Sequence, residues 1–257
     1  CLSNMPARLH QLIAIIAGIV AASLLVGISI FPSMILAIAV WGSWMVLVTA
    51  VSYRLTRWSG ALLAAAFTLW SGLFFTILDW SPAIILWLGV TGIGTGVIVW
   101  WQFLRRAPLI SFQRKPWRRV VMMVWSVTVC AAFAVLAAWH IFFPTWPTII
   151  LSLVGAVMAA LAGQQIWAMY QVPLPAVYWG WTAILGLAML EIISVVYYFL
   201  PLGYFASALL LGWLWYVAQL LIRFYESRTG IIWYRQRWFL VGNAIAIAAL
   251  LYIVRLV

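Results

Sequence analysis

Residues 14–30 read AIIAGIVAASLLVGISI, and this stretch decides the class of the fold. It carries no charged side chain and is apolar on every face, which is typical of a helix surrounded by lipid. A helix needs about 20 such residues to cross a membrane. A transmembrane β-strand would instead alternate apolar and polar residues over about ten positions. The stretch therefore predicts a membrane-spanning helix.

The composition extends this prediction to the rest of the chain. Of the 257 residues, 68% are hydrophobic and 7% are charged, whereas about a quarter of the residues of a soluble domain are charged. We predict an all-α polytopic integral membrane protein with about nine transmembrane helices, forming one transmembrane domain over residues 1–257 and no soluble domain. The predicted spans are residues 11–30, 32–53, 60–78, 82–104, 120–143, 147–170, 176–200, 204–222 and 238–254.

Basic residues predict the orientation of these spans. Thirteen of the fourteen Lys and Arg residues fall on one side of the predicted membrane, and only Arg255 falls on the other. Short loops that are rich in Lys and Arg stay in the cytoplasm. We therefore expect a multi-pass protein of a bacterial-type inner membrane, with its N-terminus in the cytoplasm and its C-terminus outside.

The connections predicted to lie outside share one pattern, in which a proline is followed by an apolar run and a glycine. The four copies read FPSMILAIAVWG, WSPAIILWLG, WPTIILSLVG and LPLGYFASALLLG. Proline is tolerated in the first turn of a helix, where its missing N–H would have no partner. The pattern predicts four helical hairpins closed on the outside, plus a C-terminal helix. Duplication of a hairpin and convergence on tight turns both explain it.

Small residues predict where helices pack closely. Gly92 and Gly96 are four positions apart, and Gly155, Ala159 and Gly163 share one face of a predicted helix. Small side chains let two helix backbones approach each other in a membrane. We expect contacts at these faces, either within the chain or between chains.

Ionisable side chains within the membrane are the candidates for function. Glu191 lies deep in the seventh span, and Asp79, His140, Tyr197 and Tyr198 are predicted at a similar depth toward the outside. If the third, fifth and seventh spans pack together, these side chains form one polar pocket. Because a buried carboxylate is costly, we expect Glu191 to be protonated at neutral pH or to reach water. The structural alternative is that Glu191 hydrogen-bonds a neighbouring helix, Asp79 caps a helix and His140 lies at the interface.

The segment RRAPLISFQRKPWRR, residues 105–119, predicts a contact with anionic lipid headgroups at the cytoplasmic face. A basic residue near an anionic membrane surface contributes about 1 kcal/mol to such a contact. Determination of the topology alone would explain the same charges, and the two roles are compatible. The residues of this predicted lipid-binding surface are Arg105, Arg106, Arg114, Lys115, Arg118 and Arg119.

The sequence predicts no catalytic residue, no cofactor and no metal site. The only lysine lies in a predicted cytoplasmic loop, and the three acidic residues form no cluster. His10 and His140 are predicted on opposite sides of the membrane, so they cannot share a haem or a metal ion. Nucleic acid is excluded as a partner because the basic residues lie in short loops between apolar runs.

Three functions remain. The first is a non-enzymatic membrane subunit or scaffold that packs against lipids, against other membrane proteins, or against further copies of itself. The second is a small proton- or cation-coupled transporter or channel that uses Glu191, and the third is a lipid-modifying enzyme with Asp79 and His140. The surroundings of Glu191 discriminate between them: a polar cavity favours transport, whereas a dry helix contact or a contact with another chain favours the scaffold.

Overall fold

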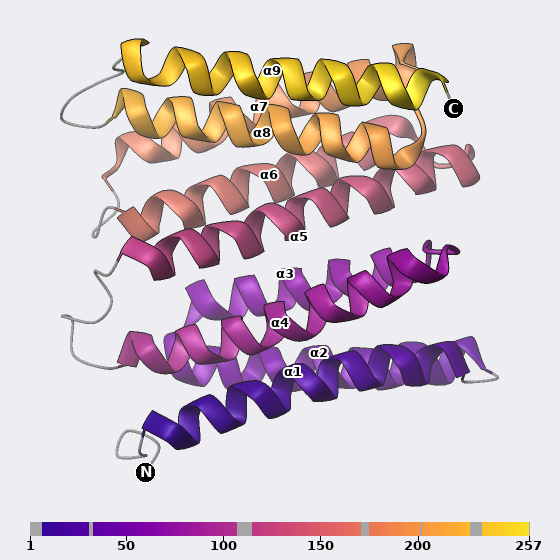
Figure 1. The fold of residues 1–257 in the computed structure, drawn as a ribbon, viewed down its shortest axis with the longest axis vertical. Helices are drawn as coiled ribbons and strands as arrows, with labels where there is room; N and C mark the ends of the chain where they lie inside the picture. The colour runs from indigo at the N-terminus through magenta and orange to yellow at the C-terminus, as the bar shows by residue number, and fades with distance from the viewer. Residues whose placement is uncertain are drawn as a thin grey trace. The chain divides into compact units, whose positions relative to one another are not determined.

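The computed structural model describes residues 7–30, 33–106, 115–170, 175–200, 202–226 and 233–256. Within these ranges the chain forms helices and no strand (Figure 1). The helices are α1 (Ala7–Ile30), α2 (Met34–Thr56), α3 (Trp58–Phe75), α4 (Ser81–Arg106), α5 (Lys115–Phe142), α6 (Thr148–Tyr170), α7 (Val177–Phe199), α8 (Tyr204–Tyr225) and α9 (Trp233–Leu256).

Each predicted span overlaps one of these helices over most of its length, so the all-helical fold is confirmed for the described residues. Eight of the described helices, α1 to α8, are long and apolar enough to cross a membrane. By this measure the chain is a multi-pass membrane protein. The α9 segment is helical but is not among the eight, so the ninth span, the four outward-closed hairpins and the orientation of the termini stay predictions.

Several helices extend beyond the apolar runs. The sequence predicts that the fifth span begins at residue 120 and the ninth at residue 238, whereas α5 begins at Lys115 and α9 at Trp233. Backbone hydrogen bonding does not stop where the side chains become basic, because long basic side chains can reach the headgroups from a continuous helix. At the α2–α3 junction, Arg57 is the single connecting residue and has a φ of 58°.

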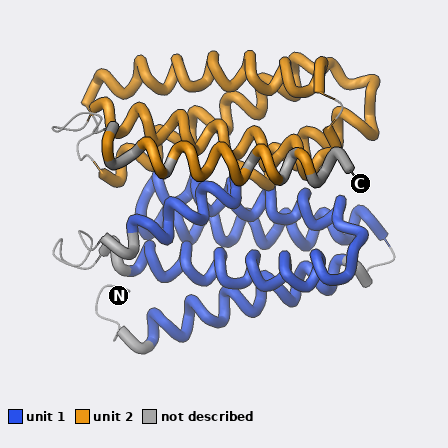
Figure 2. Tube along the Cα trace, turned by 45° about the horizontal axis from the view of Figure 1, so that its top comes forward, with its two compact units in different colours: residues 1–128 blue, residues 129–257 orange. Residues whose placement is uncertain are grey.

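The chain divides into two compact units, residues 1–128 and 129–257, with the boundary inside α5 (Figure 2). Unit 1 contains α1 to α4 and the first half of α5, and unit 2 contains the second half of α5 together with α6 to α9. The sequence predicts a single membrane domain without a soluble part, and this stays a prediction.

The closest helix contact in unit 1 joins α1 to α4. Gly18 faces Gly92, and Ala14 faces Gly96, so the two helices run antiparallel. A methyl group added at Gly18 would lie 2.5 Å from the carbonyl oxygen of Gly92, and one added at Gly96 would lie 3.1 Å from that of Ala14. The small residues at positions 92 and 96 therefore lie at a contact within the chain.

Polar side chains tie the other helices of unit 1 together through backbone carbonyls. The indole N–H of Trp41 donates to the carbonyl of Thr68 at 2.9 Å, and the indole of Trp87 donates to Ser71 at 3.1 Å. The buried amide of Gln102 donates to the Ser52 hydroxyl at 2.7 Å. These bonds connect α2 and α4 to α3, and α4 to α2, so each of these three donors has an acceptor in place of water.

In unit 2, the small residues of α6 face α5 and α7. A methyl group added at Gly155 would lie 2.9 Å from Ile193 of α7 and 3.3 Å from Leu136 of α5. One added at Gly163 would lie 2.7 Å from Leu185 of α7. The carbonyl of Ala159 accepts a hydrogen bond of 2.8 Å from the indole of Trp215 in α8. The predicted small face of α6 thus lies among three neighbouring helices.

We predict that Gly18→Ala destabilises the protein. The added methyl group would meet the backbone of α4, which cannot rotate away, and overpacking of this kind costs about 1–3 kcal/mol. Thermal unfolding of the purified protein in detergent measures the change. Gly89→Ala is the matched control, because a methyl group at Gly89 meets nothing within 4 Å. Equal melting temperatures for the two variants would contradict the close α1–α4 contact.

Candidate functional site

His140 and Tyr197 lie against each other in unit 2. His140 is near the end of α5, and Tyr197 is in the last turn of α7. Their rings are stacked, with 5.0 Å between the centroids and an interplanar angle of 10°. The structure therefore brings together two of the five side chains from which the sequence predicts a polar pocket.

Both ring nitrogens of His140 have partners. The Nε2–H group donates to the carbonyl oxygen of Tyr197 at 3.1 Å, because a carbonyl can only accept. The other nitrogen, Nδ1, is then free to accept from the Thr148 hydroxyl, 3.5 Å away. Carbonyls in the last turn of a helix have no partner within the helix. The imidazole thus caps the C-terminal end of α7, which is a structural role.

A small cavity lies beside this pair. Its volume is about 160 Å³, and its walls include His140, Tyr197 and Ser207. Water occupies about 30 Å³ per molecule in the liquid, so the space suits a few waters or a small ligand. The hydroxyl of Tyr197 is buried and has no hydrogen-bond partner. One residue in the wall of the cavity, Tyr197, therefore carries a hydroxyl whose hydrogen-bonding capacity is unused among the described residues.

Glu191 lies outside this cluster, on the opposite face of α7. Leu185, Met189 and Ile193 of the same helix are buried, whereas Glu191 is exposed. No described residue makes a hydrogen bond or an ion pair with Glu191. The hydroxyl of Ser194, one turn away, donates to the Leu190 carbonyl at 2.8 Å. The carboxyl group therefore lies on the face of α7 opposite its buried residues and has no partner among the described residues.

The remaining two residues of the predicted pocket are also exposed. Tyr198 lies on α7 with 63% of its surface accessible. Asp79 lies in the connection between α3 and α4, in unit 1. Asp79 belongs to unit 1 and the other four side chains to unit 2, so a contact between Asp79 and any of them stays a prediction.

The predicted lipid-binding segment is described only in part. Arg114 lies outside the described residues. Arg105 and Arg106 end α4 and Lys115 begins α5, but for these three residues only the backbone is described. Arg118 is half-buried and Arg119 is exposed. The contact with anionic lipid stays a prediction.

The opposite end of unit 2 carries a polar contact that the sequence does not predict. The indole N–H of Trp181, near the start of α7, donates to the carboxylate of Glu226, which follows α8, at 2.7 Å. The guanidinium of Arg223 lies 4.4 Å from the centre of the Tyr170 ring. An antiparallel α7–α8 hairpin brings these positions together. The hairpin was predicted, but one sequence offers no sign that these particular side chains meet.

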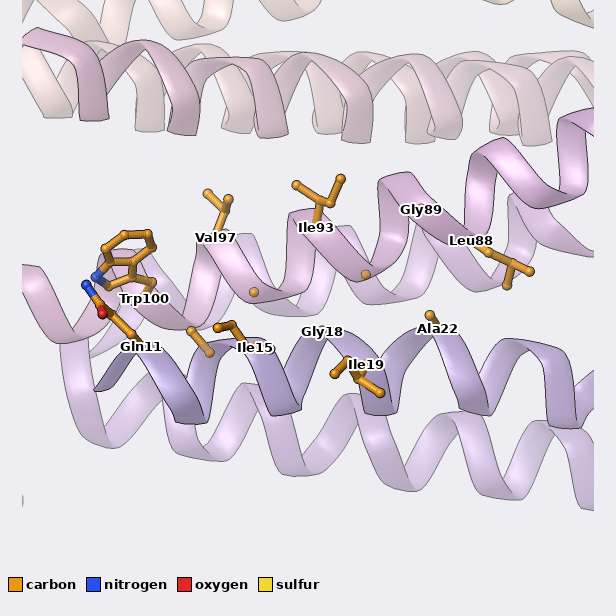
Figure 3. Close-up of a pocket in the computed structure, with 13 residues that line it drawn as sticks. Gln11, Ile15, Gly18, Ile19, Ala22, Leu88, Gly89, Ile93, Val97 and Trp100 are labelled. Atoms are coloured by element: carbon orange, nitrogen blue, oxygen red, sulfur yellow. The ribbon is translucent and has the colours of Figure 1, made fainter. Parts of the chain in front are cut away.

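An apolar groove runs along unit 1 between α1 and α4 (Figure 3). Its volume is about 720 Å³, and its walls are formed by small and aliphatic side chains such as Gly18, Ile19 and Ile93. Gln11 and Trp100 lie together at one end (Figure 3). A groove with so few polar groups suits an acyl chain or an apolar helix and does not suit a polar solute.

Metal-binding groups do not gather in the described part of the chain. Within those ranges, no three His, Cys, Asp or Glu side chains lie close enough to hold a metal ion. The side chains that meet in unit 2 are an imidazole, a phenol and two hydroxyl groups, from His140, Tyr197, Ser207 and Thr148. These groups can bind through hydrogen bonds.

We predict opposite effects for two variants of the cluster. Tyr197→Phe removes a buried hydroxyl that has no partner, which costs about 1–3 kcal/mol to bury, so stability should be unchanged or higher. His140→Ala removes the stacked ring and leaves the Tyr197 carbonyl without its donor, so stability should fall by about 1–2 kcal/mol. Thermal unfolding of both variants in one detergent measures the difference. A marked loss of stability in Tyr197→Phe would show that the hydroxyl has a partner.

Comparison with known proteins assigns this chain to no family. No protein-family model, no curated protein and no solved structure matches it. Its function therefore has to be inferred from its own residues.

Proposed function

We propose that this protein is a non-enzymatic subunit or scaffold of a membrane assembly, which packs against other membrane proteins or lipids. The observation that carries the proposal is the position of Glu191. The carboxyl group faces outward from α7 and has no partner among the described residues. A group in this position is available to another molecule, whereas a transport site needs several polar side chains that converge on the solute.

The other polar side chains of unit 2 favour the same proposal. His140 is engaged by the Tyr197 carbonyl and by the Thr148 hydroxyl. Glu226 accepts the hydrogen bond of Trp181. Both groups hold helix ends in place, and no hydrogen bond between described residues joins either of them to Glu191. Among the described residues of unit 2, His140 and Glu226 thus act as separate structural contacts, which supports the scaffold over a transporter.

The exposed surface of the helices also fits a protein that works through packing. Many large apolar side chains are accessible, including Ile35 and Met34 on α2 and Leu187 on α7. In a membrane such side chains contact lipid tails or other helices. We infer that the arginine-rich connections face the cytoplasm, following the positive-inside rule, and that they add attraction for anionic headgroups.

A proton-flux measurement tests this proposal against the transporter alternative. The purified protein is reconstituted into liposomes that contain a pH-sensitive dye, and a membrane potential is imposed. We expect the native protein and Glu191→Gln to give the same flux as empty liposomes. We also expect equal thermal stability, because Glu191 is exposed and has no hydrogen bond or ion pair with a described residue that the amide would lose.

Glu226→Gln serves as the matched control, since it neutralises the other acidic side chain of unit 2. Flux in the native protein that Glu191→Gln loses and Glu226→Gln retains would overturn the proposal. Such a result would assign proton transfer to Glu191, because an amide cannot exchange a proton.

A further inference from the structure

We propose that the exposed face of α7 around Glu191 docks a transmembrane helix of another membrane protein, and that this helix carries a basic side chain at the depth of Glu191. The proposal rests on the function proposed above and names the docking surface and the chemistry of the partner.

The docking face is one continuous line of residues along α7, which we call the α7 seam. Its accessible apolar members include Val177 at 50%, Ile184 at 52% and Leu187 at 62%. Steps of three and four residues alternate along the line, which is the heptad spacing found where two helices pack with a left-handed crossing. The seam consists of Val177, Gly180, Ile184, Leu187, Glu191, Ser194 and Tyr198.

The opposite face of α7 is already occupied by its own unit. Leu185 packs on Gly163 of α6, and Ile193 packs on Gly155. The α7 seam lies away from these contacts, so a second helix can reach it without displacing α6. Gly180 has no neighbour within 4 Å of an added methyl group, which leaves room for close approach at that end of the seam.

The α7 seam differs from a helix face that contacts only lipid, because it carries an ionisable side chain, Glu191, within the hydrocarbon region of the membrane. It lies eight residues before the end of α7 at Phe199, a distance of about 12 Å at 1.5 Å per residue. A membrane has a hydrocarbon thickness of about 30 Å, so the carboxyl group starts well inside it. Ionisable side chains at this depth are costly unless they are paired or reach water.

The complementary group does not come from the described part of this chain. The Ser194 hydroxyl is engaged by Leu190, and the His140 ring is engaged by Tyr197 and Thr148. Arg223 lies at the other end of unit 2, over the Tyr170 ring. Lipid tails offer no hydrogen-bond donor. The proposal places the partner of Glu191 on a second molecule, because none of the described residues pairs with it.

Charge complementarity selects a basic helix over a second copy of this chain. Two copies related by a twofold axis at the α7 seam would bring acid against acid. A Lys or Arg on the partner helix instead supplies both the hydrogen-bond donor and the opposite charge, and pairing relieves the desolvation cost of both groups. The heptad line of Ile184 and Leu187 beside it supplies the apolar contact.

Two synthetic transmembrane peptides test the proposal. Both are polyleucine helices of about 20 residues, and one carries a lysine at the depth that matches Glu191. Energy transfer between a labelled peptide and the labelled full-length protein in phosphatidylcholine vesicles measures association. We expect the native protein to bind the lysine peptide about tenfold more tightly than the leucine peptide.

Substitutions on the protein locate the contact. Glu191→Leu should abolish the preference for lysine, and Glu191→Gln should retain part of it, because an amide can still accept a hydrogen bond. Leu187→Trp should weaken binding of both peptides by filling the α7 seam. Ile35→Trp, on the exposed face of α2 at 81% accessibility, is the matched control and should leave binding unchanged.

Either of two results would overturn the proposal. A native protein that binds both peptides equally, or a lysine preference that persists in Glu191→Leu, would remove Glu191 as the docking group. Energy transfer between two differently labelled copies of the protein that Glu191→Leu abolishes would instead show self-association at the α7 seam. If the peptides show no preference and the liposomes show no proton flux, only the docking proposal is wrong, and the subunit function still stands. Proton flux that depends on Glu191 would contradict the subunit function itself.

Discussion

Lipid offers no hydrogen-bond partner to a peptide group, and the rest of this structure depends on that constraint. Each N–H and C=O group in the membrane must be satisfied within the protein, which makes helices the local solution for long apolar runs. Since lipid tails are as apolar as the side chains, helices associate mainly through close packing and hydrogen bonds. Gly18 against Gly92 and Gly155 against Ile193 show the packing, and the indole of Trp41 on the Thr68 carbonyl shows the bonding.

The same constraint applies to polar side chains, which differ in this structure in whether they have a hydrogen-bond partner. Gln102 and His140 are paired with groups on neighbouring helices, and each holds helices in place. Tyr197 is buried with its hydroxyl unused, so the small cavity beside it can take a water or a ligand. Glu191 is exposed and has no partner in the described chain. Among these groups, it is the one that points to a second molecule.

The sequence predicts the helices well because apolar runs of span length have few alternatives, and each predicted span overlaps an observed helix over most of its length. Helix ends are less predictable, since α5 continues into the basic segment at Lys115. The direction in which Glu191 points could not be predicted. It depends on which face of α7 packs on α6, and the apolar residues on both faces are equally hydrophobic. The sequence also does not predict the contact between Trp181 and Glu226, because that contact depends on how α7 and α8 are rotated against each other.

The orientation of Glu191 is the central claim, and spin labelling tests it most directly. A nitroxide is attached at Glu191→Cys and, separately, at Ile193→Cys, with Cys1 and Cys130 replaced by Ala. Ile193 is fully buried against α6, whereas Glu191 is exposed. Oxygen dissolves in the membrane interior, so collisions with oxygen should relax the label at position 191 strongly and the label at position 193 weakly. Equal shielding of the two labels in the purified protein would contradict the account.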